Sequence, residues 1–307
     1  ERKQGRDAVT GEALVTIDHH PDIRRMLMAM KSRVEACRAT TYYAAGLLDR
    51  VHAGTDAEQK KRDLYLAEFL IPIVKGGGTE MGIEVTSLGI QVYGGMGYIE
   101  ETGAAQHWRD SRITTIYEGT TGIQANDLIF RKLMRDQGAT ARVVFAEVAA
   151  TARVLAESDR AELQAIGHRL DAGLKAWSEA TDWLLANAKI GVSGVLTAAV
   201  PYLDLAVIVT GGWLMGKAAL AAAGITGLKP EQVKINTTFL GGGFGRRATP
   251  TSDWVSEAVH VAKAAGAPVK TVWTREDDVR GGYYRPMFLH RVRVALGGDG
   301  LPTGWDH

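Results

Sequence analysis

The stretch QVYGGMGYIEETGAAQHWRDSRITTIYEGTTGIQANDL (Gln91–Leu128) combines closely spaced glycines, a charged WRDSR run and a Tyr-Glu-Gly-Thr sequence. Gly94, Gly95 and Gly97 carry no side chain, so a ligand can approach the backbone closely at these positions. Glu118 places a carboxylate between two apolar residues and a glycine. Glycines that admit a phosphate, arginines that supply charge and one carboxylate that acts as a base form a chemically complete set. The rest of the chain is organised around this candidate site.

The residues that follow Glu118 predict the start of a helix. Thr120 or Thr121 is suited to cap it, because a threonine side chain accepts a hydrogen bond from a free backbone N–H. A carboxylate in front of such a cap would lie at the mouth of the helix. Taken alone, a glutamate at a helix start usually interacts only with free N–H groups, so its assignment as a base depends on the whole motif.

Simpler explanations exist for the other residues of the stretch. Arg109, Asp110 and Arg112 are better explained as a structural ion-pair cluster than as catalytic groups. The glycines could do no more than stop a helix. His19, His20 and His107 have no partners at metal-ligand spacing, so we assign no metal site.

Length, charge and cysteine content limit the class of protein. A chain of 307 residues has room for about two domains. The formal net charge of +1 gives no bulk attraction to nucleic acid or to a membrane surface. The single cysteine, Cys37, excludes an internal disulfide and fits a reducing compartment, so we expect a cytoplasmic location. The first residue is Glu1 rather than Met, and we expect the sequence to be a fragment.

Hydrophobic periodicity predicts helices over most of the chain. The apolar segment Val200–Ala223 is nearly long enough to span a bilayer, but Asp204 and Lys217 interrupt it. We interpret it as a buried helix of a bundle and predict no membrane span. Gly76–Gly78 are expected to break or loosen the second helix. In order, the predicted helices are Pro21–Arg50, Ala57–Ile73, Thr79–Tyr93 (with Met81, Ile83, Val85, Leu88 and Val92 in the core), Thr121–Met134, 141–158, 161–189 and Val200–Ala223.

The composition changes near Leu220–Gly227, which we take as a domain boundary. The sequence after it predicts strands at 232–240, 269–273 and 289–296 around a helix at 252–265. The predicted fold class is therefore mainly α: a helical bundle (1–138) and an extra helical segment (139–221), followed by a small α/β, β-α-β, fragment (222–307).

Residues 1 to about 138 resemble the C-terminal helical domain of the acyl-CoA dehydrogenase family of flavoenzymes. The matching motifs are ERKQGR, HPDIRRMLM, QVYGGMGY, WRDSRI and IYEGTTGIQ, in that order. Residues 139–218 resemble the extra helical segment of some members. The resemblance implies FAD-dependent oxidation of an acyl-CoA thioester to the trans-2-enoyl-CoA, in fatty acid β-oxidation. It also implies electron-transfer flavoprotein as the partner that reoxidises FAD, and a homo-oligomer.

The same resemblance implies roles for individual residues. Glu118 would be the base that removes the α-proton, and Gly119 would adjoin the substrate thioester. Because a thioester α-proton is weakly acidic, such a base must be positioned and desolvated. The residues that the resemblance assigns to FAD are Arg2 and Gln4 at the diphosphate, usually across a subunit interface, Gln91, Gly94 and Gly95 at the adenosine end, and Thr120 with Gly122 at the flavin nucleotide.

The tail from about residue 222 resembles a different family. TGLKPEQVKINTTFLGGGFGRR and VWTREDDVRGGYYRPMFLHRVRVALGGDG are similar to the large subunit of molybdenum hydroxylases, near isoquinoline 1-oxidoreductase beta subunits. That likeness implies molybdopterin contacts, in the parent of the tail, for Gly242, Gly243, Phe244 and Gly245. A dinucleotide-binding reading of GGGFGRR fails, because Arg246 stands where GxGxxG needs its last glycine.

Three hypotheses about function follow from these observations. The first is the C-terminal part of an acyl-CoA dehydrogenase, which we expect to be inactive without that family's other domains. The second is a fragment of a molybdenum hydroxylase large subunit. It lacks the later motif that carries the water-activating glutamate, so we expect no hydroxylase activity. The third is a non-catalytic helical oligomerisation module. The abrupt change near Gly224 leads us to the hypothesis that two partial, unrelated enzymes are joined there.

Overall fold

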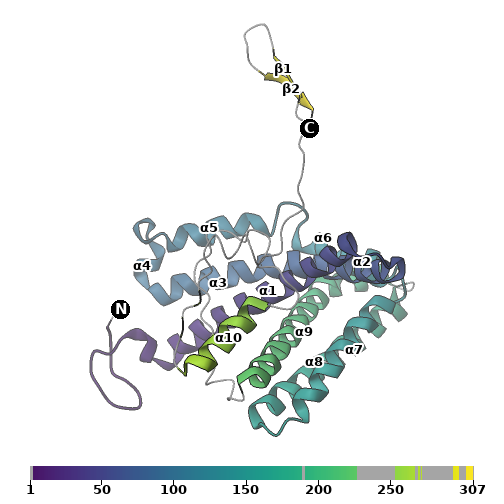
Figure 1. The fold of residues 1–307 in the computed structure, drawn as a ribbon. Helices are drawn as coiled ribbons and strands as arrows, with labels where there is room; N and C mark the ends of the chain where they lie inside the picture. The colour runs from purple at the N-terminus through teal and green to yellow at the C-terminus, as the bar shows by residue number, and fades with distance from the viewer. Residues whose placement is uncertain are drawn as a thin grey trace. The chain divides into compact units, whose positions relative to one another are not determined.

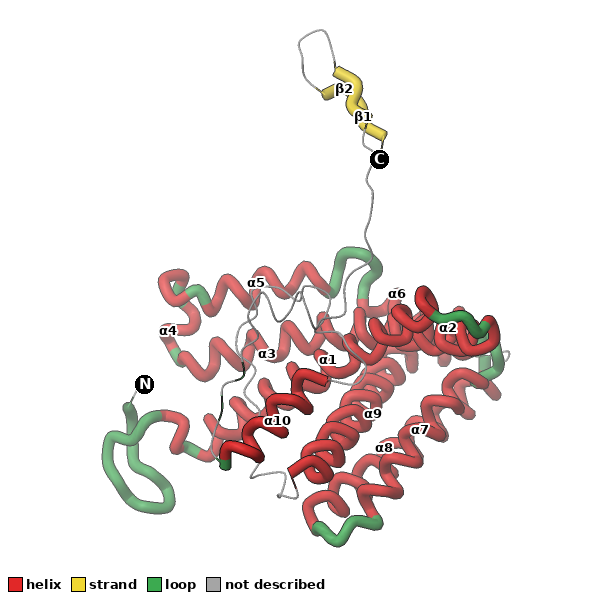
Figure 2. Tube along the Cα trace, in the orientation of Figure 1, coloured by secondary structure: helices red, strands yellow, loops and turns green. Residues whose placement is uncertain are grey.

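The computed structural model describes residues 3–188, 191–226, 253–266, 269, 271, 293–296 and 302–306. The chain divides into two compact units, Glu1–Ile235 and Asn236–His307. Helices joined by loops make up the described part of the first unit (Figure 2). The predicted helical bundle is thereby confirmed.

The elements of the first unit include two π-helical segments, η2 and η4, which continue the helices before them. Figure 1 shows their arrangement. In chain order they are η1 (Ile17–His19), α1 (Pro21–Ala53), α2 (Ala57–Pro72), η2 (Ile73–Gly77), α3 (Gly78–Tyr93), α4 (Gly95–Tyr98), η3 (Glu100–Thr102), α5 (Ala104–Thr114), α6 (Thr121–Asn126), η4 (Asp127–Leu133), α7 (Ala139–Ala156), α8 (Ala161–Asn187) and α9 (Val192–Thr226).

The core of this unit lies where α9 packs against α1, α7 and α8 (Figure 1). Trp213 on α9 is 1% exposed, and its Nε1 donates a hydrogen bond to Thr151 Oγ1 on α7 at 2.9 Å. The ring of Tyr43 on α1 meets Trp213 edge-on, with ring centroids 5.1 Å apart. One side chain therefore joins three helices through apolar burial, an aromatic contact and a satisfied indole N–H.

Helix α9 passes through the core despite its membrane-like composition. Its stretch Val192–Ala221 is long and apolar enough to cross a bilayer by length and composition, and 33% of that stretch is buried inside the fold. Its buried side chains, Val195, Leu203 and Trp213 among them, belong to the main hydrophobic cluster. The prediction of a bundle helix accounts for these contacts.

Of the two predicted outcomes at Gly76–Gly78, a break or a loosening of the helix, the structure shows the second: the helix continues, but as the π-helical segment η2 at Ile73–Gly77. Backbone helix continues from α2 through η2 into α3. The glycines let α9 approach closely: a Cβ built on Gly76 would lie 2.6 Å from Leu203 Cδ2, and one on Gly77 would lie 2.2 Å from Val207 Cγ2. Helix packing here outweighs the poor helix propensity of glycine.

Gly77→Ala is therefore expected to destabilise the bundle by about 1–3 kcal/mol, because the β-branched Val207 cannot yield without moving α9. Gly82→Ala is the matched control on α3, since a Cβ there meets nothing within 4 Å. It should stabilise by about 0.5–1 kcal/mol. Urea unfolding of both variants measures the difference, and an unchanged midpoint for Gly77→Ala would contradict the packing argument.

Helix α3 supplies no fully buried side chain, which corrects a prediction. The five residues that the sequence placed in the core are only half-buried: Met81, Ile83, Val85, Leu88 and Val92. The pattern identified the apolar face of α3 correctly. It could not show how much of that face this chain covers, and α3 packs mainly on α1 and α5.

The second unit has one described helix, α10 (Asp253–Ala265), and two described strands, β1 (Arg293–Leu296) and β2 (Pro302–Asp306). The strands pair antiparallel, with Arg293 opposite Asp306. Helix α10 and β1 agree with the predicted helix at 252–265 and the predicted last strand. The expected strand at 232–240 lies outside the described residues. The sequence did not predict β2.

Candidate active site

Glu118 lies in the loop between α5 and α6, and its backbone is left-handed. Its φ is 53°, and that of Gly119 is 91°. Glycine adopts such angles freely, whereas a glutamate at positive φ costs of the order of 1–3 kcal/mol and persists only where neighbours hold it. The Glu118 side chain is exposed. The walls that would desolvate a base at this position are absent from the described part of the chain.

Two side chains hold the backbone on the C-terminal side of Glu118. Lys75 of η2 donates through Nζ to Gly119 O and to Thr114 O, the latter at 3.1 Å. Gln124 of α6 donates through Nε2 to Glu118 O at 3.3 Å. Sequence reasoning missed both residues. The available signal for Lys75 was a lone charge inside the apolar run FLIPIVKGGG.

The predicted helix start after Glu118 is present. Thr120 is the N-cap of α6, and its Oγ1 accepts a hydrogen bond from Ile123 N at 3.3 Å. Thr121 is the first residue of α6, and its hydroxyl donates to Glu80 Oε1 on α3. Of the two threonines offered as caps, Thr120 has that role, while Thr121 ties α6 to α3.

The glycines of the stretch fall into two groups. Gly94 ends α3 with a φ of 66°, and a Cβ on Gly97 would lie 2.4 Å from Ile90 O, so packing within the chain explains both. A Cβ on Gly95 meets nothing within 4 Å, and one on Gly122 meets only Thr120 Oγ1, at 4.0 Å. The described contacts leave Gly95 and Gly122 free to be approached by another group.

The WRDSR arginines are structural, as predicted, but their partners differ from those expected. Arg109 forms a bidentate ion pair with Glu100, with distances of 2.9 and 2.6 Å. The hydrogen bonds that Arg109 donates to the Glu100 carboxylate raise the pKa of Arg109. Arg112 donates to the hydroxyl of the buried Thr115. A cluster within the run was expected, yet the carboxylate comes from η3.

The remaining predicted residues are scattered or undescribed. Gln91 is exposed in the last turn of α3. Gln4 lies in the N-terminal segment, where its carbonyl oxygen is 2.6 Å from His20 Nε2. Arg2 and the tail residues Gly242, Gly243, Phe244 and Gly245 lie outside the described residues. Within residues that the structure describes, no three His, Cys, Asp or Glu side chains are grouped so as to hold a metal ion.

Large apolar side chains of the stretch Gln91–Leu128 are exposed. Where such side chains adjoin one another, they mark a surface that another domain, chain or ligand covers. The exposed side chains include Tyr93, Met96, Tyr98, Trp108, Ile113, Ile116, Tyr117 and Ile123.

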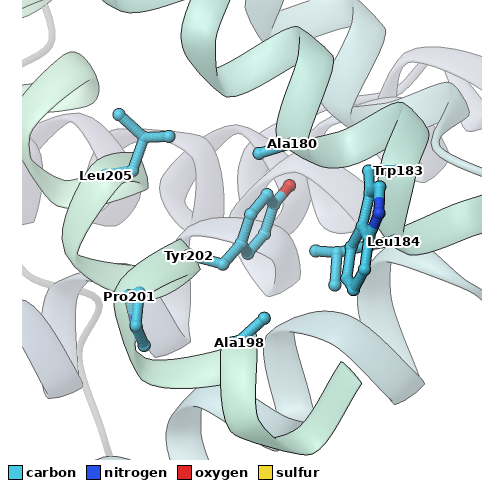
Figure 3. A pocket seen from close by; sticks show the side chains of 7 residues that line it. All are labelled: Ala180, Trp183, Leu184, Ala198, Pro201, Tyr202 and Leu205. Carbon is cyan, nitrogen blue, oxygen red and sulfur yellow. The ribbon is translucent and has the colours of Figure 1, made fainter. Parts of the chain in front are cut away.

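A separate apolar cavity of about 260 Å³ opens between α8 and α9. Figure 3 shows the residues that line it, with the Tyr202 ring facing Ala180 and Leu184. None of the predicted site residues line it. The cavity is therefore not the candidate active site.

Models of known families match three parts of the chain. Residues 9–133 match the acyl-CoA dehydrogenase C-terminal domain, and residues 144–238 match the acetyl-CoA dehydrogenase C-terminal-like family. Residues 208–307 match the molybdopterin cofactor-binding domain. Both resemblances drawn from the sequence are thereby confirmed. Two successive parts of the chain thus match acyl-CoA dehydrogenase C-terminal domains, and the match to the molybdopterin domain follows them.

Individual relatives agree with this division. The chain is 46% identical to 3-methylmercaptopropionyl-CoA dehydrogenase of Ruegeria pomeroyi over 208 residues, which is 68% of this chain and 35% of that protein. It is 41% identical to the broad-specificity linear acyl-CoA dehydrogenase FadE5 of Mycobacterium tuberculosis over 128 residues, 40% of this chain and 20% of that protein. It is 39% identical to isoquinoline 1-oxidoreductase subunit beta of Brevundimonas diminuta over 75 residues, 24% of this chain and 9% of that protein.

A solved structure supports the helical fold. Caenorhabditis elegans ACDH-11 in complex with C11-CoA aligns with a TM-score of 0.55 at 20% identity. The alignment covers 70% of this chain and 35% of that one. The chain thus spans about a third, or less, of the length of the relatives described here.

Proposed function

We propose that the first 226 residues form the C-terminal part of an FAD-dependent acyl-CoA dehydrogenase in which Glu118 removes the α-proton of the thioester. The observation that carries the proposal is the backbone at Glu118. A glutamate with a φ of 53° is strained, and two side-chain donors hold the carbonyl oxygens that follow it. Strain of this kind gathers at active sites. The loop falls inside the segment that matches the dehydrogenase domain.

The residues assigned to FAD are compatible with a bound cofactor. A Cβ on Gly95 would meet nothing within 4 Å, one on Gly122 would meet only Thr120 Oγ1, and Thr120 itself is exposed. Gln91 and Gly94 lie at the end of α3, next to Gly95. When bound, FAD supplies the acceptor for the hydride that leaves the β-carbon. Arg2 and Gln4 would contact the diphosphate of a cofactor held mainly by another subunit.

In the proposed reaction, this chain supplies the base, Glu118, and holds it in its orientation. Glu118 takes the α-proton, and Gly119, which has no side chain, lets the thioester lie against the backbone. Because Glu118 is exposed here, a domain or subunit that covers Ile116 and Tyr117 must exclude water before the carboxylate can act as a base.

The partners follow from the same proposal. The substrate is an acyl-CoA, and electron-transfer flavoprotein receives the electrons. One relative, from Acetobacterium woodii, is named as a subunit of a caffeyl-CoA reductase-Etf complex. A homo-oligomer, a cytoplasmic location and domain limits at 138 and 221 remain predictions.

A second candidate function rests on the tail. Its match to the molybdopterin cofactor-binding domain favours descent from a molybdenum hydroxylase large subunit. The tail relative is covered over only 9% of its length. We propose that the tail is a partial domain joined to the dehydrogenase part, without hydroxylase activity.

The test uses the protein as its gene encodes it. We expect about one FAD per chain, no molybdenum, and bleaching of the flavin absorbance when an acyl-CoA is added without oxygen. Stoichiometric molybdenum would support the hydroxylase reading instead. A colourless protein that does not take up added FAD would support the third hypothesis, a non-catalytic helical module.

A further inference from the structure

We propose that Lys75 is the positioning residue of the Glu118 loop, and that α9 holds it in place. The inference rests on the proposed function of Glu118 and adds a part of the same site that the family motifs do not include. Its basis is a set of contacts between η2, α9 and the loop at residues 115–119, together with the backbone geometry at Glu118.

The loop needs an external support. Both Glu118 and Gly119 have positive φ, and only glycine adopts such a conformation without strain. Any relaxation of Glu118 toward negative φ would turn its side chain away from its present direction. The direction of the carboxylate therefore depends on what holds the flanking peptide groups.

Lys75 supplies that support from one ammonium group. It donates to Thr114 O, in the last turn of α5, and to Gly119 O, directly after Glu118. Carbonyl groups in the last turn of a helix lack partners within the helix, and a cation at this end is also favoured by the helix dipole. The two bonds tie the two ends of the loop to a single atom. The Lys75 ammonium also lies over the ring of Tyr117, with Nζ 5.9 Å from the ring centroid, a cation–π contact to a third part of the loop.

The charge of Lys75 has no competing partner in the described part of the chain. It is half-buried, and no carboxylate there lies within ion-pair distance of it. Lys132, in the second π-helical segment, shows the usual alternative, because its Nζ lies 3.8 Å from Glu68 and 3.7 Å from Asp127. Burying a cation without an anion is costly unless its N–H groups are satisfied, and here the carbonyl oxygens of Thr114 and Gly119 accept two of the three.

The position of Lys75 is fixed by α9. Lys75 lies in the π-helical segment η2, and such turns frequently occur at functional sites. The next two residues, Gly76 and Gly77, seat η2 directly on Leu203 and Val207 of α9. The extra helical segment thus acts on Glu118 through a short chain of contacts, from α9 through η2 and Lys75 to the loop.

The first test needs neither flavin nor substrate. In the 307-residue chain, Lys75→Met should raise hydrogen exchange of the amides at residues 116–121 by about tenfold or more, because two bonds to a charged donor are lost. Exchange in α7 and α8 should stay unchanged. Lys132→Met, the matched control, should leave the loop unchanged. Unaltered loop exchange in Lys75→Met would overturn the proposal.

If Lys75→Met fails to fold, a measurement on the unaltered chain replaces it. The ammonium protons of Lys75, observed by nitrogen-15 NMR at neutral pH, should exchange with water more slowly than those of exposed lysines such as Lys31. Exchange as fast as that of Lys31 would reject the hydrogen bonds to the loop.

The second test uses the full gene product with FAD bound. Lys75→Met should lower kcat about 10–100-fold while KM and FAD content stay within about twofold, because the base is displaced and binding is not. Lys132→Met should leave kcat and KM unchanged. A rise in KM or a loss of bound FAD, without a fall in kcat, would assign Lys75 a merely structural role. If loop exchange rises but Glu118→Gln does not impair turnover, the positioning stands and the proposed base is wrong.

Discussion

On the proposed function, Glu118→Gln is expected to lower acyl-CoA turnover by about 10²–10⁴-fold in the full gene product, the range that a positioned general base contributes. Glutamine has nearly the same shape and keeps the side chain in place, but it cannot accept the α-proton. FAD should remain bound, because the cofactor contacts are assigned to other residues. Steady-state oxidation of an acyl-CoA with an artificial electron acceptor measures the loss, and the flavin spectrum measures cofactor content.

Glu101→Gln is the matched control for this experiment. Glu101 is another exposed glutamate of the same stretch, in η3. Its replacement should leave turnover within about twofold, since surface substitutions away from a site have small effects. Turnover that survives Glu118→Gln would remove the base assignment, and with it the mechanistic part of the proposed function.

Trp213→Ala is expected to destabilise the first unit by about 3–5 kcal/mol, the range for truncating a buried tryptophan. The indole is 1% exposed, stacks edge-on against Tyr43 and donates to Thr151 Oγ1. Truncation would leave a cavity between α1, α7 and α9 and remove the donor to Thr151 Oγ1, whose own hydrogen bond to Glu147 O remains. Chemical unfolding followed by far-ultraviolet circular dichroism gives the change in free energy.

Trp183→Ala provides the comparison within the same fold. Trp183 lines the cavity between α8 and α9 and is 49% exposed, so its truncation should cost no more than about 1 kcal/mol. Equal losses for the two tryptophans would contradict the assignment of Trp213 to the centre of the core.

Local chemistry made much of the fold predictable from sequence. Apolar periodicity located α1, α7 and α8, and the threonine after Tyr-Glu-Gly marked the cap of α6. The continuity of the helix through Gly76–Gly78, where a break was one of the two expectations, has a physical cause. Glycine propensity is a local quantity, whereas the approach of α9 to these residues depends on a segment that follows about 125 positions later.

The site was predictable only in part. Glu118 and its glycine neighbours are recognisable because their spacing is a motif. The hydrogen bonds of Lys75 go to backbone carbonyl oxygens. Because every residue has a backbone carbonyl, the residue types at the acceptor positions do not reveal such bonds. The partner of Arg109 was missed for a related reason: the chain turns through η3 and brings Glu100 alongside α5. The exposed faces of α3 and of the loop are left uncovered by the part of the chain that the structure describes.

Helix α9 also bears on how the chain can be divided. The two family matches overlap over residues 208–238, and α9 extends to Thr226. Val209, Thr210, Trp213 and Leu214 are in the overlap, yet all are buried in the helical bundle. A gene cut at codon 208 would leave four residues of the helical core, among them Trp213, on the tail and remove them from the bundle. Modules that are to be exchanged or expressed separately must therefore be cut after α9. The start of the family match at residue 208 and the end of the folded helix at Thr226 are different boundaries.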